Sequence, residues 1–217
     1  MRVRFVSDEL AIVIPVLNRP HNVAPLLDSI SAATPGARIL FVCDASDLAE
    51  IAEIDAAGAE HIDPGGGYAA KINLGVEATD EPFVFFGADD LEFVPGWLDA
   101  ARRQMDRAGA AVIGVNDLIR RNRLHSTHFL VTREYAQRSA IDGSRGPLFE
   151  GYDHSFVDDE FVATAKARGT YAYAAEAKVR HNHPMNQTAP DDDTYRRGRE
   201  HFRMDRKRFQ RRTKHWI

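Results

Sequence analysis

Short apolar segments alternate with helix-like segments through the first half of the chain, and this alternation restricts the possible folds more than any other feature. Residues 10–16, 38–43, 82–86 and 111–115 are apolar, rich in Val, Ile and Phe, and typical of buried strands. The segments between them predict helices over residues 22–33, 48–57, 68–78 and 96–108. This order predicts right-handed βαβ units and an α/β fold whose mostly parallel central sheet is flanked by helices.

The pattern changes after residue 116. We expect a strand over residues 127–132, a helix over 155–168, short strands over 171–174 and 178–180, and a polar helix after Pro190. A length of 217 residues suits one main domain. We therefore expect a domain at residues 1–190 and a basic helical extension at residues 191–217.

Charge is distributed unevenly along the chain. The net charge is −4, but residues 195–217 contain ten Lys or Arg residues and only two acids. The tail is thus basic and the rest of the chain is acidic. Such a tail suits contact with an anionic membrane surface or with nucleic-acid phosphates, and it also suits packing onto the acidic body or self-association.

The single cysteine, Cys43, lies in an apolar run and has no partner for an internal disulfide. We expect it to be a small buried hydrophobic residue in a protein of the reducing cytoplasm. The apolar runs are strand-sized and fall short of the roughly 20 residues that span a bilayer. We therefore expect no transmembrane segment, and we see no targeting segment.

Polar residues follow the predicted strands where each strand ends. The loop at residues 15–20 follows the first strand, Asp44 and Ser46 follow the second, and Asp89 and Asp90 follow the strand at 82–86. Carboxyl ends of parallel strands are where ligands bind in such sheets. Helix N-capping is an alternative role for Asp44 or Ser46. Two adjacent carboxylates repel each other and need a counter-charge, which a divalent cation supplies.

Several segments together resemble family 2 glycosyltransferases, which have the GT-A fold of nucleotide-diphospho-sugar transferases. The resemblance covers roughly residues 10–185. It rests on residues 11–20 (AIVIPVLNRP), 41–46 (FVCDAS), 65–75 (GGGYAAKINLG), 85–98 (FFGADDLEFVPGWL), 157–161 (VDDEF) and 181–184 (HNHP). Each motif is weak alone, but their order and spacing are specific. The resemblance implies an inverting enzyme that transfers a sugar from a nucleotide-diphosphate sugar to an acceptor hydroxyl.

The resemblance also implies a divalent cation, Mn2+ or Mg2+, on the acidic motif. Its candidate ligands are Asp89, Asp90, His183 and His181, although the two histidines also fit an ordinary surface loop. This chain departs from the family by reading Gly87-Ala88-Asp89 where many relatives have Asp-x-Asp. Cys43 also replaces a frequent Asp.

The resemblance implies a nucleotide-sugar site at the same sheet edge. Its candidate residues are Pro15, Asn18, Arg19, Asp44, Gly67, Lys71, Asn73 and Asp89. Asp44 is expected to contact the nucleotide base. For Lys71 the alternative is a solvated surface lysine, and for the glycines at 65–67 it is a simple turn.

The later acidic motif supplies candidates for the general base that deprotonates the acceptor. These are Asp158, Asp159 and Glu160, of which Asp158 aligns best with the family motif, although Val157 stands where many relatives carry Glu. The alternative is that all three acids only stabilise a helix N-terminus. Tyr152, Asp153 and His154 precede this motif and are candidate acceptor contacts.

Other functions remain possible on sequence grounds. A sugar nucleotidyltransferase is disfavoured because the loop at residues 15–20 has no glycine. A metal-dependent hydrolase would use His181, His183 and the acids. A non-catalytic or lapsed relative would bind nucleic acid through the basic tail. The donor sugar and the acceptor, whether lipid, polysaccharide, protein or DNA, are not fixed by the sequence.

Overall fold

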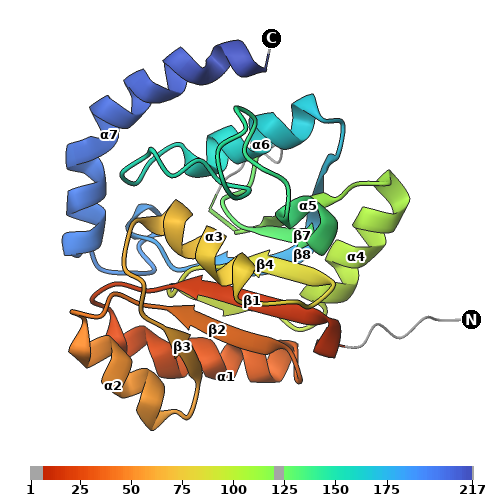
Figure 1. The fold of residues 1–217 in the computed structure, drawn as a ribbon. Helices are drawn as coiled ribbons and strands as arrows, with labels where there is room; N and C mark the ends of the chain where they lie inside the picture. Colours follow the sequence, from red (N-terminus) through yellow and green to blue (C-terminus); the bar gives the residue numbers. More distant parts are fainter. Residues whose placement is uncertain (1–6, 120–124, 217) are drawn as a thin grey trace, which may run out of the picture.

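The computed structural model describes residues 7–119 and 125–216, and within them the chain forms a central sheet covered by helices on both faces (Figure 1). The strands are β1 Leu10–Pro15, β2 Arg38–Val42, β3 Glu60–Ile62, β4 Phe83–Phe86, β5 Leu91–Phe93, β6 Val112–Asn116, β7 Phe129–Thr132 and β8 Tyr171–His181. The α-helices are α1 Val23–Ala33, α2 Leu48–Ala56, α3 Tyr68–Glu77, α4 Trp97–Ala108, α5 Arg133–Ala136, α6 Val157–Ala167 and α7 Asp193–Arg212. Short 3-10 helices lie at Ser7–Glu9, Pro20–Asn22, Pro184–Asn186 and Thr213–His215.

The strands are ordered β3-β2-β1-β4-β7-β6-β8-β5 across the sheet. Pairs β1–β2, β1–β4, β2–β3 and β6–β8 are parallel, whereas β7 runs antiparallel to both of its neighbours and β5 runs antiparallel to β8. The prediction of an α/β fold with a mostly parallel sheet is confirmed. The ends of β1, β2 and β4 meet at one edge, as parallel pairing requires.

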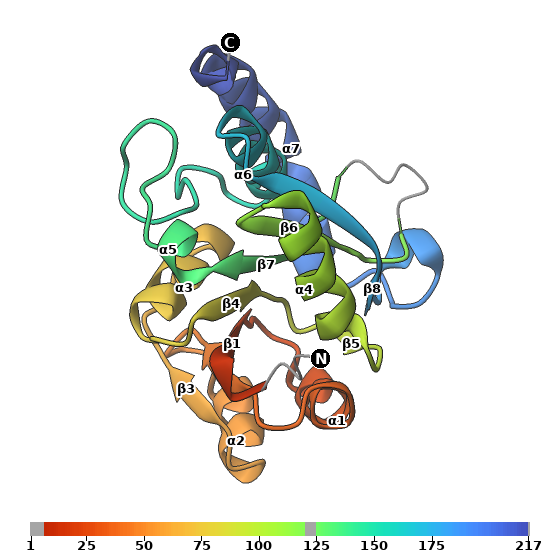
Figure 2. The same cartoon turned by 90° about the vertical axis from the view of Figure 1, so that its right-hand side faces the viewer.

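Alternate strand residues enter two separate cores. Ile12, Ile14 and Phe85 face one core with α1 and α4, while Val13 and Phe86 face the other with α3 and α6. Figures 1 and 2 show these helices on opposite faces of the sheet. Since both faces are covered, all residues of β1 are buried, and this explains its uniformly apolar sequence.

The C-terminal part of the sheet differs from the expectation. The two short strands expected at residues 171–174 and 178–180 are one strand, β8, which pairs with β6 through an irregular register. Strands β3 and β5 were not expected, because three polar or mixed residues give no periodic signal. They form because neighbouring strands supply their hydrogen-bond partners.

Close packing of α3 on β1 depends on Gly75. A Cβ atom at this position would lie 2.2 Å from Cγ1 of Val13, which is fully buried. We expect Gly75→Ala to lower the free energy of unfolding by about 1–3 kcal/mol. The cost of overpacking should exceed the gain from the better helix propensity of alanine. Urea titration of both proteins would measure the loss.

Gly67→Ala is the matched control for this substitution. A Cβ atom at Gly67 would have its nearest neighbours at 3.9 Å, and the φ of Gly67 is −76°. This variant should lose only about 0.5 kcal/mol of stability, because alanine is a poorer N-cap than glycine. Equal stability of the Gly75→Ala variant and the parent would contradict the packing argument.

Candidate functional site

Arg19 lies between the two carboxylates that follow β4. Its Nη1 is 3.0 Å from Asp89 Oδ1 and 2.8 Å from Asp90 Oδ2, and its Nε is 2.7 Å from Asp192 Oδ2. Arg19 and both neighbouring acids are almost wholly buried. The counter-charge that the sequence required is therefore supplied, in this structure, by a guanidinium from the β1 loop.

The two acids titrate differently because their surroundings differ. Burial and the adjacent charge of Asp90 raise the pKa of Asp89 well above its usual range, against the opposing effect of Arg19. Burial also opposes ionisation of Asp90, but His181, the Tyr195 hydroxyl and Arg19 outweigh it and lower the pKa of Asp90. Asp90 therefore has three partners that favour its charged form, namely Arg19, His181 and Tyr195, whereas Asp89 is held by Arg19.

A row of aromatic rings lines the same edge of the sheet. His181 Nε2 lies 3.2 Å from Asp90 Oδ1. The His181 ring centroid is 5.0 Å from that of His128 and 5.1 Å from that of His183, which in turn packs on Tyr195. Burial, with His181 nearby, lowers the pKa of His128 to about 4, so His128 is neutral near pH 7. Sequence reasoning missed His128, which lies just before β7 and outside the motifs that carry the family resemblance.

The donor atoms present fit a divalent cation. Asp90 Oδ1 is buried without a hydrogen-bond partner and faces the imidazole nitrogen of His181. A carboxylate oxygen with an imidazole nitrogen suits Mn2+, and a carboxylate suits Mg2+. The described residues contain two groups of three close potential ligands, and neither includes these two residues. Further ligands would therefore have to come from water or substrate.

Helix α7 covers this edge of the sheet. The Tyr195 hydroxyl donates to Asp90 Oδ2 at 2.6 Å, and Asp192 accepts from Arg19. A cavity of about 220 Å³ lies beside these contacts and is lined in part by His21, Asn182 and Thr188. The basic helix thus packs onto the acidic body, one of the arrangements that its charge suggested, and it contributes Tyr195 to the acidic site.

The loops after β1 and β2 are joined by acids of α2. Asp47 caps α2 by accepting from Glu50 N, and it also accepts from Asn18 N at 2.5 Å. Glu50 accepts from Arg19 N at 2.6 Å. The N-capping alternative for Asp44 or Ser46 is therefore wrong. Asp44 is half-buried, and its Oδ1 accepts from the backbone amide and the hydroxyl of Ser46, so that one of its oxygens is engaged locally.

The remaining expected donor-site residues occupy different surroundings. Lys71 is buried, and its Nζ donates to Val16 O at 2.7 Å, so the surface-lysine interpretation is wrong. On another side of α3, the Asn73 side-chain amide donates hydrogen bonds to Leu148 O and Glu150 Oε1. Pro15 ends β1, and Gly67 precedes α3 as its N-cap. Lys71 therefore lies near the β1 loop, whereas the amide of Asn73 holds the segment before α6.

The three acids of the later motif diverge at the first turn of α6. Asp158 Oδ2 lies 2.9 Å from His125 Nε2, and Asp159 Oδ1 lies 3.6 Å from the same nitrogen. Glu160 is buried elsewhere, between the Tyr152 hydroxyl and Arg212 of α7. Asp158 and Asp159 therefore share one histidine, which sequence reasoning missed, while Glu160 has a structural ion pair.

The segment expected to contact the acceptor is held by one carboxylate. Asp205 of α7 is fully buried and accepts from the backbone amides of Asp153, His154 and Ser155 at 3.1, 2.9 and 2.9 Å. Gly198 packs so closely on His154 that a Cβ atom would lie 2.4 Å from its ring. Helix α7 therefore fixes the backbone that leads into α6.

Cys43 is buried, as the sequence predicted. Burial, together with nearby acids, raises the pKa of its thiol from 9.0 to about 12. At pH 8 the thiol of the folded protein is therefore kept almost wholly protonated. We expect an aromatic disulfide reagent to label the folded protein at least about 100-fold more slowly than protein unfolded in guanidinium chloride. Equal labelling rates, followed by absorbance, would contradict this expectation.

The raised pKa of the Cys43 thiol also makes stability depend on pH. Its contribution to the free energy of unfolding is fully present below pH 9 and is lost as the pH rises through about 12.

A family model and several solved structures match this chain. The family model described as "Glycosyl transferase family 2" matches residues 11–166. No curated protein sequence matches the chain. No helix within residues 7–119 and 125–216 combines the length and apolar character needed to cross a membrane.

Solved structures share the fold at low sequence identity. The mannosyltransferase PcManGT from Pyrobaculum calidifontis, in complex with GDP-Man and Mn2+, has a TM-score of 0.67 and 13% identity over 89% of this chain and 61% of that one. Glucosyl-3-phosphoglycerate synthase from Mycobacterium tuberculosis, with Mn2+, UDP and phosphoglyceric acid, has a TM-score of 0.63 and 15% identity over 89% and 75%. The structure of TarS residues 1–349 from S. aureus has a TM-score of 0.58 and 13% sequence identity, over 78% of this chain and 59% of that one. The chain therefore spans about three fifths of two of these proteins.

Proposed function

The chain belongs to glycosyl transferase family 2 and has the GT-A fold, and from this membership we propose that it is an inverting glycosyltransferase. Its donor would be a nucleotide-diphosphate sugar and its acceptor a hydroxyl group. The observation that carries the proposal is the buried pair Asp89 and Asp90 at the end of β4, beside the β1 loop and inside the matched segment. We propose that it acts in the cytoplasm.

Asp90 and His181 are the proposed holders of Mn2+ or Mg2+, with Asp89 and His183 beside them. A bound cation would stabilise the negative charge that develops on the leaving diphosphate. Arg19 would add a second positive charge near the leaving diphosphate, because its buried guanidinium contacts both acids. The unpartnered Asp90 Oδ1 supports this assignment.

Asp158 is the proposed general base. It lies at the first turn of α6 beside His125, which orients its carboxylate. The acceptor hydroxyl would lose its proton to Asp158 as its oxygen attacks the anomeric carbon and the diphosphate leaves. Asp159 is the alternative base. Glu160 is a poorer candidate because Arg212 neutralises it.

The proposed donor pocket uses the segments after β1, β2, β3 and β4 together with the first turns of α3. Its residues would be Pro15, Asn18, Arg19, Asp44, Gly67, Lys71, Asn73 and Asp89. The half-buried Asp44 would meet the nucleobase through Oδ2, the oxygen that Ser46 does not contact, while Lys71 and Asn73 would act through the backbone segments that they hold. Tyr152, Asp153 and His154 would border the acceptor.

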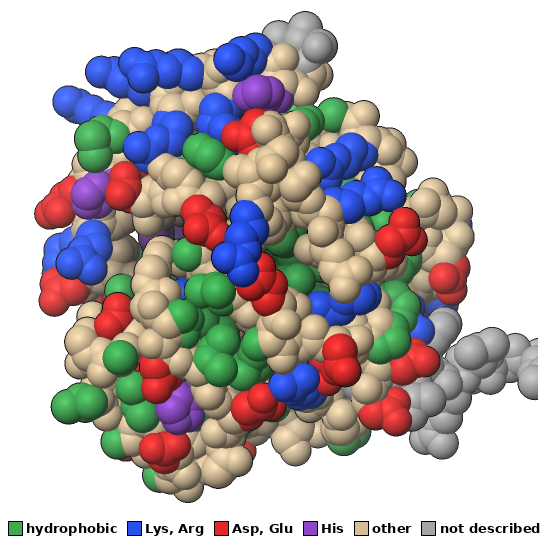
Figure 3. Space-filling model, viewed as in Figure 1, with side chains coloured by type: hydrophobic (Ala, Val, Ile, Leu, Met, Phe, Trp, Pro, Cys, Tyr) green, Lys and Arg blue, Asp and Glu red, His purple; other side chains and the backbone are tan. Residues whose placement is uncertain are grey.

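A second candidate function uses the outer face of α7, the helix of the proposed extension at residues 191–217. Five exposed basic residues of α7 have no acidic partner among the described residues, and neither does Lys214 of the following 3-10 helix. The five are Arg197, Arg203, Arg206, Lys207 and Arg211. Figure 3 shows Lys and Arg side chains gathered along this helix. Such a face suits an anionic membrane surface or nucleic-acid phosphates, and a non-catalytic protein would act through this face alone.

A thermal-shift screen tests the proposed function. The purified chain would be heated with UDP-, GDP-, CDP- and dTDP-sugars, each with and without Mn2+. A ligand at a hundredfold excess over its Kd stabilises the native state by about 2.7 kcal/mol. We expect a metal-dependent rise in Tm with one nucleotide class. Folded protein that responds to no nucleotide but binds anionic vesicles or DNA would favour the second function.

A further inference from the structure

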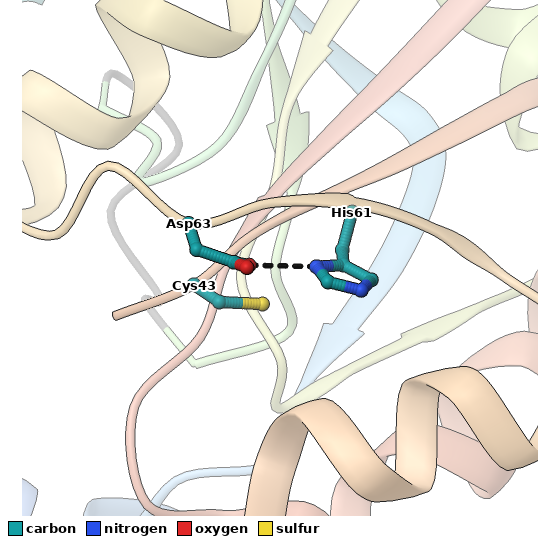
Figure 4. A group of neighbouring side chains, drawn as sticks. All are labelled: Cys43, His61 and Asp63. Atoms are coloured by element: carbon teal, nitrogen blue, oxygen red, sulfur yellow. Dashed lines mark hydrogen bonds and ion pairs between the residues drawn. The ribbon is translucent and has the colours of Figure 1, made fainter. Parts of the chain in front are cut away.

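Cys43, His61 and Asp63 form a compact group at the open edge of the sheet, apart from the acid pair (Figure 4). Strand β3 pairs with β2 so that Ile62 lies opposite Val42, and the next amide, Cys43 N, donates to Ile62 O. Side chains two residues apart point to the same face of a strand. His61 and Asp63 therefore share one face, and Cys43 from the neighbouring strand joins them.

The atoms that approach one another are those that bind zinc. A sulfur, an imidazole nitrogen and a carboxylate oxygen all lie within 4.8 Å of one another, and His61 Nδ1 is 2.6 Å from Asp63 Oδ1. Cysteine, histidine and aspartate are the ligand types that Zn2+ takes in tetrahedral sites. Figure 4 shows the sulfur of Cys43 alongside the contact between His61 and Asp63.

The position of Asp55 is an independent indication that His61 binds a metal. Asp55 Oδ1 of α2 lies 3.2 Å from His61 Nε2, the ring nitrogen that faces away from Asp63. Histidines that bind a metal through one nitrogen commonly donate the other N–H to a carboxylate, which fixes the ring and its tautomer. This arrangement leaves His61 Nδ1 directed at the centre of the group.

The simpler interpretation is a protonated His61 held by two acids, and the pKa of His61 is indeed raised by Asp63 and Asp55. An ion pair of this kind gives no role to the thiol, whereas a zinc site uses all three ligand atoms. A metal ion could enter the group from the side of Asp63, which is exposed, although Cys43 is buried.

We propose that Cys43, His61 and Asp63 bind one Zn2+ ion, with Asp55 orienting His61 and the fourth position open to water. Binding replaces the thiol proton of Cys43, which passes to solvent as the Zn–S bond forms. The ion would tie the three-residue edge strand β3 to β2. It would also steady the adjoining turn, where Gly65 packs against Asp44.

Cobalt titration of the chelator-treated full chain tests the proposal. Cobalt bound to a thiolate gives an intense near-ultraviolet charge-transfer band, and Cys43 is the only cysteine in the chain. A cation on Asp90 and His181 gives no such band, so the two sites are distinguished. We expect the band to saturate at one equivalent, to disappear when Zn2+ is added, and to be absent in Cys43→Ser.

The neighbouring residues give variants that keep the thiol. His61→Gln and Asp63→Asn alter partly exposed side chains, and each should weaken Zn2+ binding at least tenfold. Asp55→Asn should weaken it by about 10–100-fold. The controls are His21→Gln and Asp80→Asn, which change exposed residues and should bind as the parent does. Absence of the band, or full Zn2+ affinity in both His61→Gln and Asp63→Asn, would overturn the proposal.

Discussion

Asp90→Asn is expected to reduce the release of nucleoside diphosphate from the donor sugar by about 100-fold or more. Arg19, Tyr195 and His181 all contact the Asp90 carboxylate, and its Oδ1, which makes no hydrogen bond, lies 3.2 Å from His181 Nε2. An amide keeps the shape of the side chain but removes the anionic ligand, and losing one such electrostatic contact costs about two to three orders of magnitude in rate. Initial rates would be measured with the donor and cation found in the thermal-shift screen.

The matched control for this measurement is Asp80→Asn, whose side chain is 98% exposed. It should retain the parent rate. Asp90→Asn should also keep a cooperative thermal transition, because Arg19 retains Asp89 and Asp192 as partners. A folded Asp90→Asn variant with an undiminished rate would show that the acid pair has a structural role only.

Asp205→Ala is expected to lower the free energy of unfolding by about 3 kcal/mol or more. The buried carboxylate accepts from three consecutive backbone amides and from Arg208. Its removal leaves several buried donors without an acceptor, and hydrogen bonds to a charged group are worth about 1.5–3 kcal/mol each. In a chain of this size the Tm should fall by about 6–12 °C.

Calorimetry of Asp205→Ala beside Glu200→Ala would separate this contact from general effects on the helix. Glu200 is an exposed acid of the same helix, and its replacement should leave the Tm within about 2 °C of the parent, since surface substitutions change stability little. Similar Tm values for the two variants would mean that α7 does not hold residues 153–155 in solution.

The first half of the fold was predictable because its signals are local. Segments such as Leu10–Pro15 are uniformly apolar, and the helices between them show buried faces at helical spacing. The acids after β4 were predictable for the same reason, since parallel strands bring their carboxyl ends to one edge. The predicted family and fold are both confirmed.

What could not be predicted depends on contacts between distant residues. Arg19 meets Asp192, which lies 173 positions away, and no spacing rule connects them. His125 and His128 lie three residues apart but outside the motifs of the family resemblance, and only the fold shows that they reach Asp158 and His181. The late acids looked equivalent in sequence, and Arg212 distinguishes Glu160 from its two neighbours.

Helix α7 is bonded near its start to the acid pair after β4 and at its end to α6, so its unfolding is coupled to both. Tyr195 bonds to Asp90 near its start, and Arg212 bonds to Glu160 at its end. Opening either end exposes a buried acid, so fraying of this helix should cost more than fraying of an ordinary terminal segment. Slow amide exchange along α7 would then mark the helix and the acidic edge as a single unit of local unfolding.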